Sequence, residues 1–178
     1  MDFGKLLVRI VVGGFFVGHG LQKLRGSFGG PGLEGTAAMM EALEMRPAKR
    51  NALAASLSET VGGAGIVLGL GTPFAAAALV GSMVTAVRKV HLAKGPWNAE
   101  GGWEYNAVLI AVVAGLTNDG PGDLSVDALV GKSRWGLPWA LFALVAGFAG
   151  SAAAIEAGKR MPPEVATDEA AAAADPSI

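Results

Sequence analysis

Long apolar runs, separated by short polar and glycine-rich stretches, dominate the hydropathy pattern of this chain. They cover residues 4–24, 51–70, 73–92, 104–116 and 135–155. A helix needs about 20 apolar residues to cross a hydrocarbon core of ~30 Å, and four of the runs reach or approach that length. The pattern therefore predicts membrane-spanning helices. The fourth run is short, and we expect it to use flanking turns or to cross where the bilayer is thinner.

The connectors between these runs are of two kinds. Between the second and third runs lies only "GLGTPF", in which Gly71 can end one helix and Pro73 suits the first turn of the next. This spacing predicts a tight helical hairpin. In the longer first connector Leu33, Ala37 and Met40 share one helical face, which predicts a short amphipathic helix at the membrane surface.

Overall composition agrees with a membrane protein. Of the 178 residues, 52% are apolar and only 16% are charged, against about 25% charged in soluble domains, and the mean hydropathy is +0.45. The formal net charge is −1, so the chain has no basic excess suited to nucleic acid. After Ile155 an alanine-rich, acidic segment with prolines predicts a flexible or loosely helical tail.

The chain has no cysteine. This excludes disulfides, thiolate-held iron–sulfur clusters and dithiol relays. Only His19 and His91 remain as good transition-metal ligands, and no metal site is predicted. Electrons that pass through such a chain must be carried by a bound cofactor, a quinone or a partner protein.

Lysine and arginine are unevenly divided between the two sides of the predicted bundle. If all five runs cross, one side carries five Lys or Arg residues in the first connector, three in the connector between the third and fourth runs, and two after the fifth run. The other side carries four: Lys5, Arg9, Lys132 and Arg134. Because cytoplasmic loops are enriched in Lys and Arg, the richer side is predicted to be cytoplasmic and the N-terminus to face outward.

One helical face of the first run collects three ionisable residues together with small and aromatic ones. At about 100° per residue, this face contains Arg9, Gly13, Phe16, His19, Gly20 and Lys23. We expect it to contact other helices. Alternatively, Arg9 and Lys23 extend to the two headgroup layers. His19 lies deeper and fits a reactive group and a hydrogen-bonded packing histidine equally well.

The second run carries a carboxylate about halfway along it, Glu59 in "SLSETVGG". A carboxylate at this depth must be protonated, paired or hydrated, which makes Glu59 the most informative residue of the chain. We predict that it belongs to a functional site. A purely structural pairing with Arg9, His19 or Arg88 is the alternative.

Further polar residues are predicted near the cytoplasmic leaflet. In the third run Thr85, Arg88 and His91 are spaced three apart and form a polar ridge, whereas Lys89 points elsewhere and can reach the surface. Glu104 stands at the start of the fourth run. The predicted site lines a pocket between helices and combines groups from four runs: His19, Lys23, Glu59, Arg88, His91 and Glu104.

Four segments in this order resemble the DoxX family of small bacterial membrane proteins: "RIVVGGFFVGHGLQKL", "FGGPG", "ETVGGAGIVLGLGTPFAAAALVGSMVTAV" and "GGWEYNAVLIAVVAGLTNDGPGDLSVD". The resemblance covers residues 5–130. It implies a four-helix membrane core over residues 1–130, with residues 131–156 as an additional transmembrane helix and residues 157–178 as the tail. The family's recurrent polar pattern falls on His19, Gly20, Lys23, Glu59 and Glu104.

The resemblance also implies a link to redox chemistry in the bacterial plasma membrane, because relatives include the DoxD-type subunits of thiosulfate:quinone oxidoreductase. The first hypothesis is a subunit of an oxidoreductase assembly that binds a quinone or a small sulfur compound. His19 or Glu59 would exchange protons as catalytic groups, while Arg88 and Lys23 would hold an anion or a quinone carbonyl.

Two other functions are compatible with the same residues. The second hypothesis is a scaffold that recruits soluble redox enzymes to the inner leaflet, using the acidic tail and the helix in the first connector. The third is a pathway for a small solute or for protons, suggested by Glu59 and the glycines around it. A homo-oligomer is compatible with each hypothesis, and in the first one the chain itself can be a non-catalytic subunit.

Overall fold

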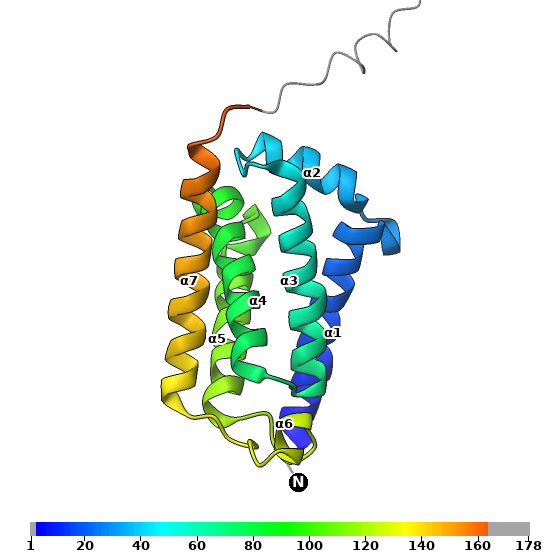
Figure 1. Ribbon diagram of the computed structural model, residues 1–178, viewed down its shortest axis with the longest axis vertical. Helices are drawn as coiled ribbons and strands as arrows, with labels where there is room; N and C mark the ends of the chain where they lie inside the picture. The colour runs from blue at the N-terminus through cyan, green and yellow to red at the C-terminus, as the bar shows by residue number, and fades with distance from the viewer. Residues whose placement is uncertain (1–2, 164–178) are drawn as a thin grey trace, which may run out of the picture.

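The computed structural model describes residues 3–163 and shows an all-helical bundle, without β-strands in that range (Figure 1). The long helices are α1 Phe3–Arg25, α3 Ala48–Leu68, α4 Thr72–Ala86, α5 Glu104–Asp119 and α7 Leu137–Lys159. Helix α2 Gly32–Ala42 lies across one end of the bundle, and the short α6 Val126–Leu129 lies at the other. These are called the α2 end and the α6 end below.

Helix α4 continues without a break beyond its α-helical part. A π-helical turn, Val87–His91, follows directly and leads into a 3-10 turn, Leu92–Lys94. Two further 3-10 turns, Ser27–Gly29 and Asn98–Glu100, lie in connectors at the α2 end. The helix that begins as α4 therefore changes its winding within the predicted polar ridge of Thr85, Arg88 and His91.

Three helical segments of the described chain are long and apolar enough to span a membrane: Phe3–Arg25, Thr72–Lys94 and Leu137–Lys159. All three run from the α6 end to the α2 end (Figure 1), so α3 and α5 must return the chain across the same thickness. Helix α5 has 16 residues, about 24 Å at 1.5 Å per residue, and its connectors cover the remainder. The prediction of a polytopic four-helix membrane bundle with a fifth helix, α7, is confirmed.

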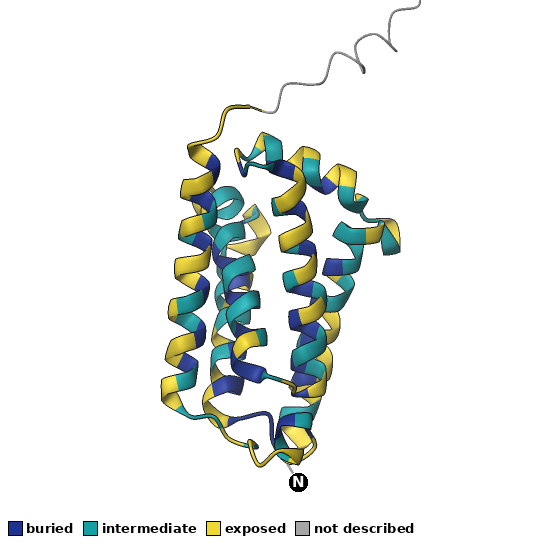
Figure 2. Cartoon of the chain, in the orientation of Figure 1, coloured by how far each residue is buried: buried dark blue, intermediate teal, exposed yellow. Residues whose placement is uncertain are grey.

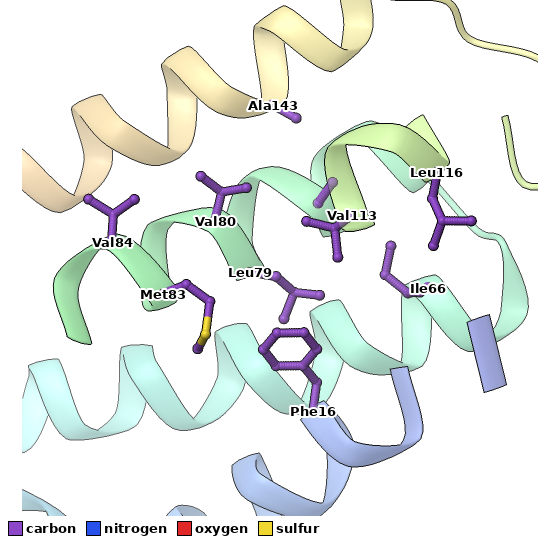
Figure 3. Packing of buried hydrophobic residues seen from close by; sticks show 10 residues of the cluster. Phe16, Ile66, Leu79, Val80, Met83, Val84, Val113, Leu116 and Ala143 are labelled. Carbon is purple, nitrogen blue, oxygen red and sulfur yellow. The ribbon is translucent and has the colours of Figure 1, made fainter. Parts of the chain in front are cut away.

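Helix α4 is the centre of the packing. It contacts α3 on one side and both α5 and α7 on the other, while α1 packs on α3. Figure 3 shows Phe16 of α1 beneath Leu79 of α4, and Val80 of α4 directed toward Ala143 of α7. Figure 2 shows exposed residues along the outward sides of the helices. Many of them are large and apolar, such as Phe15, Val61 and Val145, which suits contact with lipid.

The predicted amphipathic helix of the first connector is present as α2. Its apolar side, with Leu33, Ala37 and Met40, packs against Ala52 of α3 and Ile155 of α7. The apolar face is thus used to cover the bundle at the α2 end.

The predicted tight hairpin between α3 and α4 is also present, with one difference. Gly69, with φ of 60°, ends α3, whereas Gly71, with φ of 55°, directly precedes α4. Pro73 lies in the first turn of α4, as predicted. Both glycines have a left-handed conformation, which other residues adopt at a cost.

Helix α7 extends past Ile155 to Lys159. Its last turns pack on the α2–α3 connector. The contact is so close at Gly158 that a Cβ atom there would lie 2.6 Å from the carbonyl oxygen of Glu44. The predicted tail is described only as far as residue 163, and the rest of that prediction lies outside the described residues.

Candidate functional site

Glycines allow α1 and α3 to pack backbone against backbone. A Cβ atom at Gly20 would lie 2.5 Å from the backbone nitrogen of Thr60 and 2.8 Å from the carbonyl oxygen of Ser56. Gly13 and Gly63 meet in the same way, with 2.7 Å between a Cβ atom on Gly13 and the carbonyl oxygen of Gly63. Such small-residue contacts are typical of membrane helices. They bring the side chains at the end of α1 within reach of α3.

A buried ion pair joins α1 and α3 near this contact. Lys23 Nζ donates a hydrogen bond to Glu59 Oε2, and Ser82 Oγ of α4 donates to Glu59 Oε1 at 2.8 Å. Glu59 is only 3% exposed, whereas 24% of the Lys23 side chain is exposed. Three helices therefore enclose the carboxylate with a cation and a hydroxyl donor, which meets the requirement for a charge at this depth.

A groove of about 440 Å³ passes this ion pair and runs mainly toward the α2 end. Its walls are α3, α4 and α7, and the side chains of Met39, Met40 and Met45 cover its top. On α4 the lining residues recur in pairs every four positions from Ala77 to Val90, so the groove follows the helix for about 20 Å at 1.5 Å per residue. Most of the lining is alanine, glycine or serine, whose small size leaves the space open.

The groove opens sideways between α3 and α7. Ala54 of α3 and Gly150 of α7 both line it and are exposed, and so is Met39 of α2. The opening therefore lies on the side of the bundle whose apolar outer faces suit lipid.

Hydroxyl and ammonium groups continue from the ion pair toward the α2 end. Above Ser82 the hydroxyl of Thr85 on α4 lies 2.9 Å from the hydroxyl of Ser151 on α7. Ser151 is 2% exposed, and Lys89 lines the groove one turn farther on. The groove is thus apolar on most of its wall and polar along one line.

Lys89, and not Arg88, faces the groove, so the predicted polar ridge of Thr85, Arg88 and His91 is wrong. In an α-helix the residue four positions after Thr85 already lies closer to its direction, at about 40°, than the residue three positions after it, at about 60°. The π turn increases this difference, because its i→i+5 hydrogen bonds place more residues in each turn. A residue four positions after Thr85 then stays on the groove side, whereas the residue three positions after it is rotated away. Arg88 is exposed.

His19 does not join the groove. It is exposed on α1, where its Nδ1 lies 3.0 Å from Gln22 Oε1 in a shallow surface hollow beside Phe28. The predicted common face holds for Arg9, Gly13, Phe16 and Gly20, which are buried. His19 and Lys23 stand at its edge, His19 about 40° farther out than Lys23. Only the long lysine chain reaches back to α3.

His91 and Glu104 organise the connector between α4 and α5 instead of the groove. His91 Nδ1 lies 2.7 Å from the carbonyl oxygen of Gly101, and Glu104 Oε1 accepts a hydrogen bond from the backbone nitrogen of Asn98 at 2.9 Å. The single predicted cluster is therefore not formed: of its six residues, the structure brings together only Lys23 and Glu59.

The groove also contains Ser82, Lys89 and Ser151, which the sequence pattern did not identify as site residues. Ser82 and Ser151 are isolated serines in apolar runs, and a serine in a membrane helix commonly bonds its own backbone. The signal that could have found them is the repeat of small residues every four positions on α4 and on α7, which indicates two facing helix surfaces with space between them.

Arg9 is bound to backbone carbonyl groups at the α6 end and does not pair with Glu59, contrary to one alternative above. Its guanidinium group donates four hydrogen bonds of 2.6–3.0 Å, to the carbonyl oxygens of Ile66, Val67, Pro121 and Leu124. Arg9 is 2% exposed, so it does not extend to the headgroups either. The first two carbonyls belong to the last turn of α3, where the Ile66 oxygen also accepts a hydrogen bond from the backbone nitrogen of Gly69 at 3.1 Å.

Asp127 binds the start of α4 beside this arginine. Its carboxylate accepts hydrogen bonds from the backbone nitrogens of Gly71 and Thr72 at 2.7 and 3.0 Å, from the Thr72 hydroxyl at 2.8 Å and from Trp135 Nε1 at 3.0 Å. Burial favours the neutral acid, but the hydrogen bonds outweigh it and hold the pKa of Asp127 below its ordinary value. Together Arg9 and Asp127 fix the connector of residues 120–136 over the α3–α4 hairpin.

The lowered pKa of Asp127 predicts a loss of stability in acid. The stabilising contribution is complete above the ordinary pKa of 3.8 and disappears as the pH falls through the lower folded-state value. The thermal midpoint of the wild-type chain, followed from pH 7 downward, should therefore fall more steeply below about pH 4 than that of Asp127→Asn. Asp123→Asn, an exposed carboxylate in the same connector, should keep the wild-type profile. Parallel profiles for wild type and Asp127→Asn would contradict the assignment.

Within residues 3–163, histidine, aspartate and glutamate side chains do not gather in groups of three that could hold a metal ion. The groove instead offers one carboxylate, two ammonium groups and several hydroxyls on an apolar wall. This donor set suits an amphiphilic organic molecule better than a metal ion.

Comparison with known proteins gives one match. The family model described as DoxX matches residues 4–92, half of the 178 residues. The match covers α1 to α4 and therefore contains Lys23, Glu59 and Ser82. No curated protein and no solved structure matches the chain.

Proposed function

The chain belongs to the DoxX family, and we propose that its groove binds a quinone-class molecule as part of a membrane redox assembly. The observation that carries this proposal is the sideways opening of an apolar groove onto a buried Lys23–Glu59 pair. A quinone is dissolved in the membrane and has an apolar body with polar carbonyl oxygens at its ring. Both parts have a counterpart in the groove.

Each polar residue at the inner end of the groove has a distinct role in this proposal. The Lys23 ammonium group has donors for a ring carbonyl as well as for Glu59. Glu59 accepts or returns the proton that a ring oxygen exchanges on reduction. Ser82 orients the carboxylate through its hydrogen bond to Oε1.

Reduction of a quinone to a quinol takes up two electrons and two protons. The chain has no cysteine to hold a thiolate-bound cluster, so we propose that a partner protein supplies the electrons. The α2 end, which carries most of the lysine and arginine residues of the bundle, is the proposed docking side. We propose that it faces the bacterial cytoplasm, which the positive-inside rule supports. This partner surface also accommodates the scaffold hypothesis, in which the chain recruits a soluble redox enzyme.

Photolabelling of the full chain in lipid nanodiscs with an azido-quinone tests the proposal. Glu59→Gln should lower specific labelling by about tenfold or more, because the neutral amide leaves Lys23 unpaired and removes the proton acceptor. His19→Ala is the matched control, since His19 lies outside the groove, and it should label like wild type. Equal labelling of wild type and Glu59→Gln, or labelled peptides from the outer face of α1, would refute the quinone site.

A further inference from the structure

The two ends of the bundle differ in how polar groups continue from Glu59. Toward the α2 end, Ser82, Thr85 and Ser151 follow one another along the groove, and the part-exposed Lys89 lines it one turn beyond Thr85. Each hydroxyl can both donate and accept a hydrogen bond. The groove volume of about 440 Å³ has room for several water molecules, at about 30 Å³ each, beside these polar partners.

Toward the α6 end, the groove ends at the level of Ala77 and Ala78, and the apolar core lies beyond it. Phe16, Ile66 and Leu79 are buried there in the apolar core (Figure 3). Beyond them the donors of Arg9 and the acceptors of Asp127 are held by backbone groups and by Trp135. A close-packed apolar layer followed by a satisfied polar cluster leaves no continuous hydrated route on this side.

We infer that water enters the groove at the α2 end beside the part-exposed Lys89, at the edge of the methionines that cover its top, and that Glu59 exchanges protons with the aqueous phase on that side alone. The inference rests on the proposed function for the use of these protons, but the hydration itself does not depend on which ligand binds. A proton that leaves the Lys23–Glu59 pair for a ligand oxygen is replaced by one from water at the α2 end. It passes along water molecules bound to Ser151, Thr85 and Ser82, and no bond other than O–H and N–H bonds is broken.

The absence of cysteine from the sequence allows a direct test. Single cysteines in the full chain, reconstituted in liposomes, are treated with a membrane-impermeant sulfonated methanethiosulfonate, which reacts only with the hydrated thiolate. Ser151→Cys and Ser82→Cys place a thiol on the proposed route. Lys49→Cys at the α2 end and Lys132→Cys at the α6 end report the fraction of molecules in which each end faces the outside of the liposome, where the reagent is added.

Two matched variants separate hydration from simple exposure. Ala153→Cys lies on the exposed face of α7 close to Ser151, where lipid should suppress thiolate formation. Thr117→Cys replaces a fully buried hydroxyl on α5 that bonds its own backbone. Both should react at least about tenfold more slowly than Ser151→Cys, because the reactive species is the thiolate.

The expected result is that Ser151→Cys and Ser82→Cys are labelled in the same fraction of molecules as Lys49→Cys. Resistance of both thiols while Lys49→Cys is labelled would overturn the inference, as would labelling that follows Lys132→Cys. If Ser82→Cys disturbs Glu59 and fails to fold, Ser151→Cys alone decides. The outcome is separate from the azido-quinone test: a labelled groove without quinone binding refutes only the proposed ligand, and quinone binding in a dry groove refutes only the water route.

Discussion

Arg9→Met is expected to destabilise the folded chain by on the order of 3 kcal/mol, although it makes the first helix more apolar. Arg9 donates to four carbonyl groups and is 2% exposed. Hydrogen bonds to a charged donor contribute about 1.5–3 kcal/mol each and do not add fully. Methionine fills the space but donates nothing. Unfolding in detergent, followed by circular dichroism, should show a fall in Tm of roughly 10 °C.

Two further substitutions identify the cause. Arg88→Met removes an arginine that is exposed near the other end, and its Tm should stay within about 2 °C of wild type because exposed substitutions rarely cost more than about 0.5 kcal/mol. Arg9→Lys keeps the charge but has only one nitrogen, so it should fall between Arg9→Met and wild type. A wild-type Tm for Arg9→Met would mean that the connector of residues 120–136 holds its place without the arginine.

The helices themselves could be predicted because the bilayer fixes how long an apolar run must be. Run 51–70 became α3 Ala48–Leu68, and run 135–155 became α7 Leu137–Lys159, with boundaries shifted by a few residues. The amphipathic pattern at Leu33, Ala37 and Met40 likewise predicted α2, because the same face must be buried whether it meets lipid or other helices.

The side chains that share a site depend on rotations that periodicity does not contain. The ridge containing Arg88 relied on a spacing of three residues, but the π turn rotates Arg88 farther from the groove and Lys89 lines the groove instead. His19 was assigned to the face of Lys23 because 40° is a small angle on a helical wheel. It is large enough to turn a short imidazole away from α3, whereas a lysine side chain can bend back.

Contacts between distant segments were beyond any local pattern. Arg9 bonds Pro121 and Leu124, which lie 112 and 115 residues farther along the chain. Nothing in the first run distinguishes such a residue from an arginine that extends to the headgroups. The same holds for α7: Ser151 acquires its role only because α7 packs on α4.

Gly20→Val should disrupt both the bundle and the proposed site. The new Cβ atom would lie 2.5 Å from the Thr60 nitrogen and 2.8 Å from the Ser56 carbonyl oxygen, and both are backbone atoms of α3 that cannot move alone. Helix α1 must therefore move away from α3. We expect a loss of about 3 kcal/mol, at the upper end for an overpacked core, together with loss of azido-quinone labelling because Lys23 no longer reaches Glu59.

Gly14→Val and Gly18→Val provide the matched comparison on the same helix. A Cβ atom at either position has no atom of another helix within 4 Å, and valine is well tolerated where a membrane helix meets lipid. Both variants should keep the wild-type Tm and labelling. If Gly20→Val behaved like them, the close approach of α1 and α3 would not be required for the Lys23–Glu59 pair. If all three variants lost stability, the flexibility of α1 and not its contact with α3 would be what the glycines provide. Only the expected difference assigns Gly20 to the contact that positions Lys23.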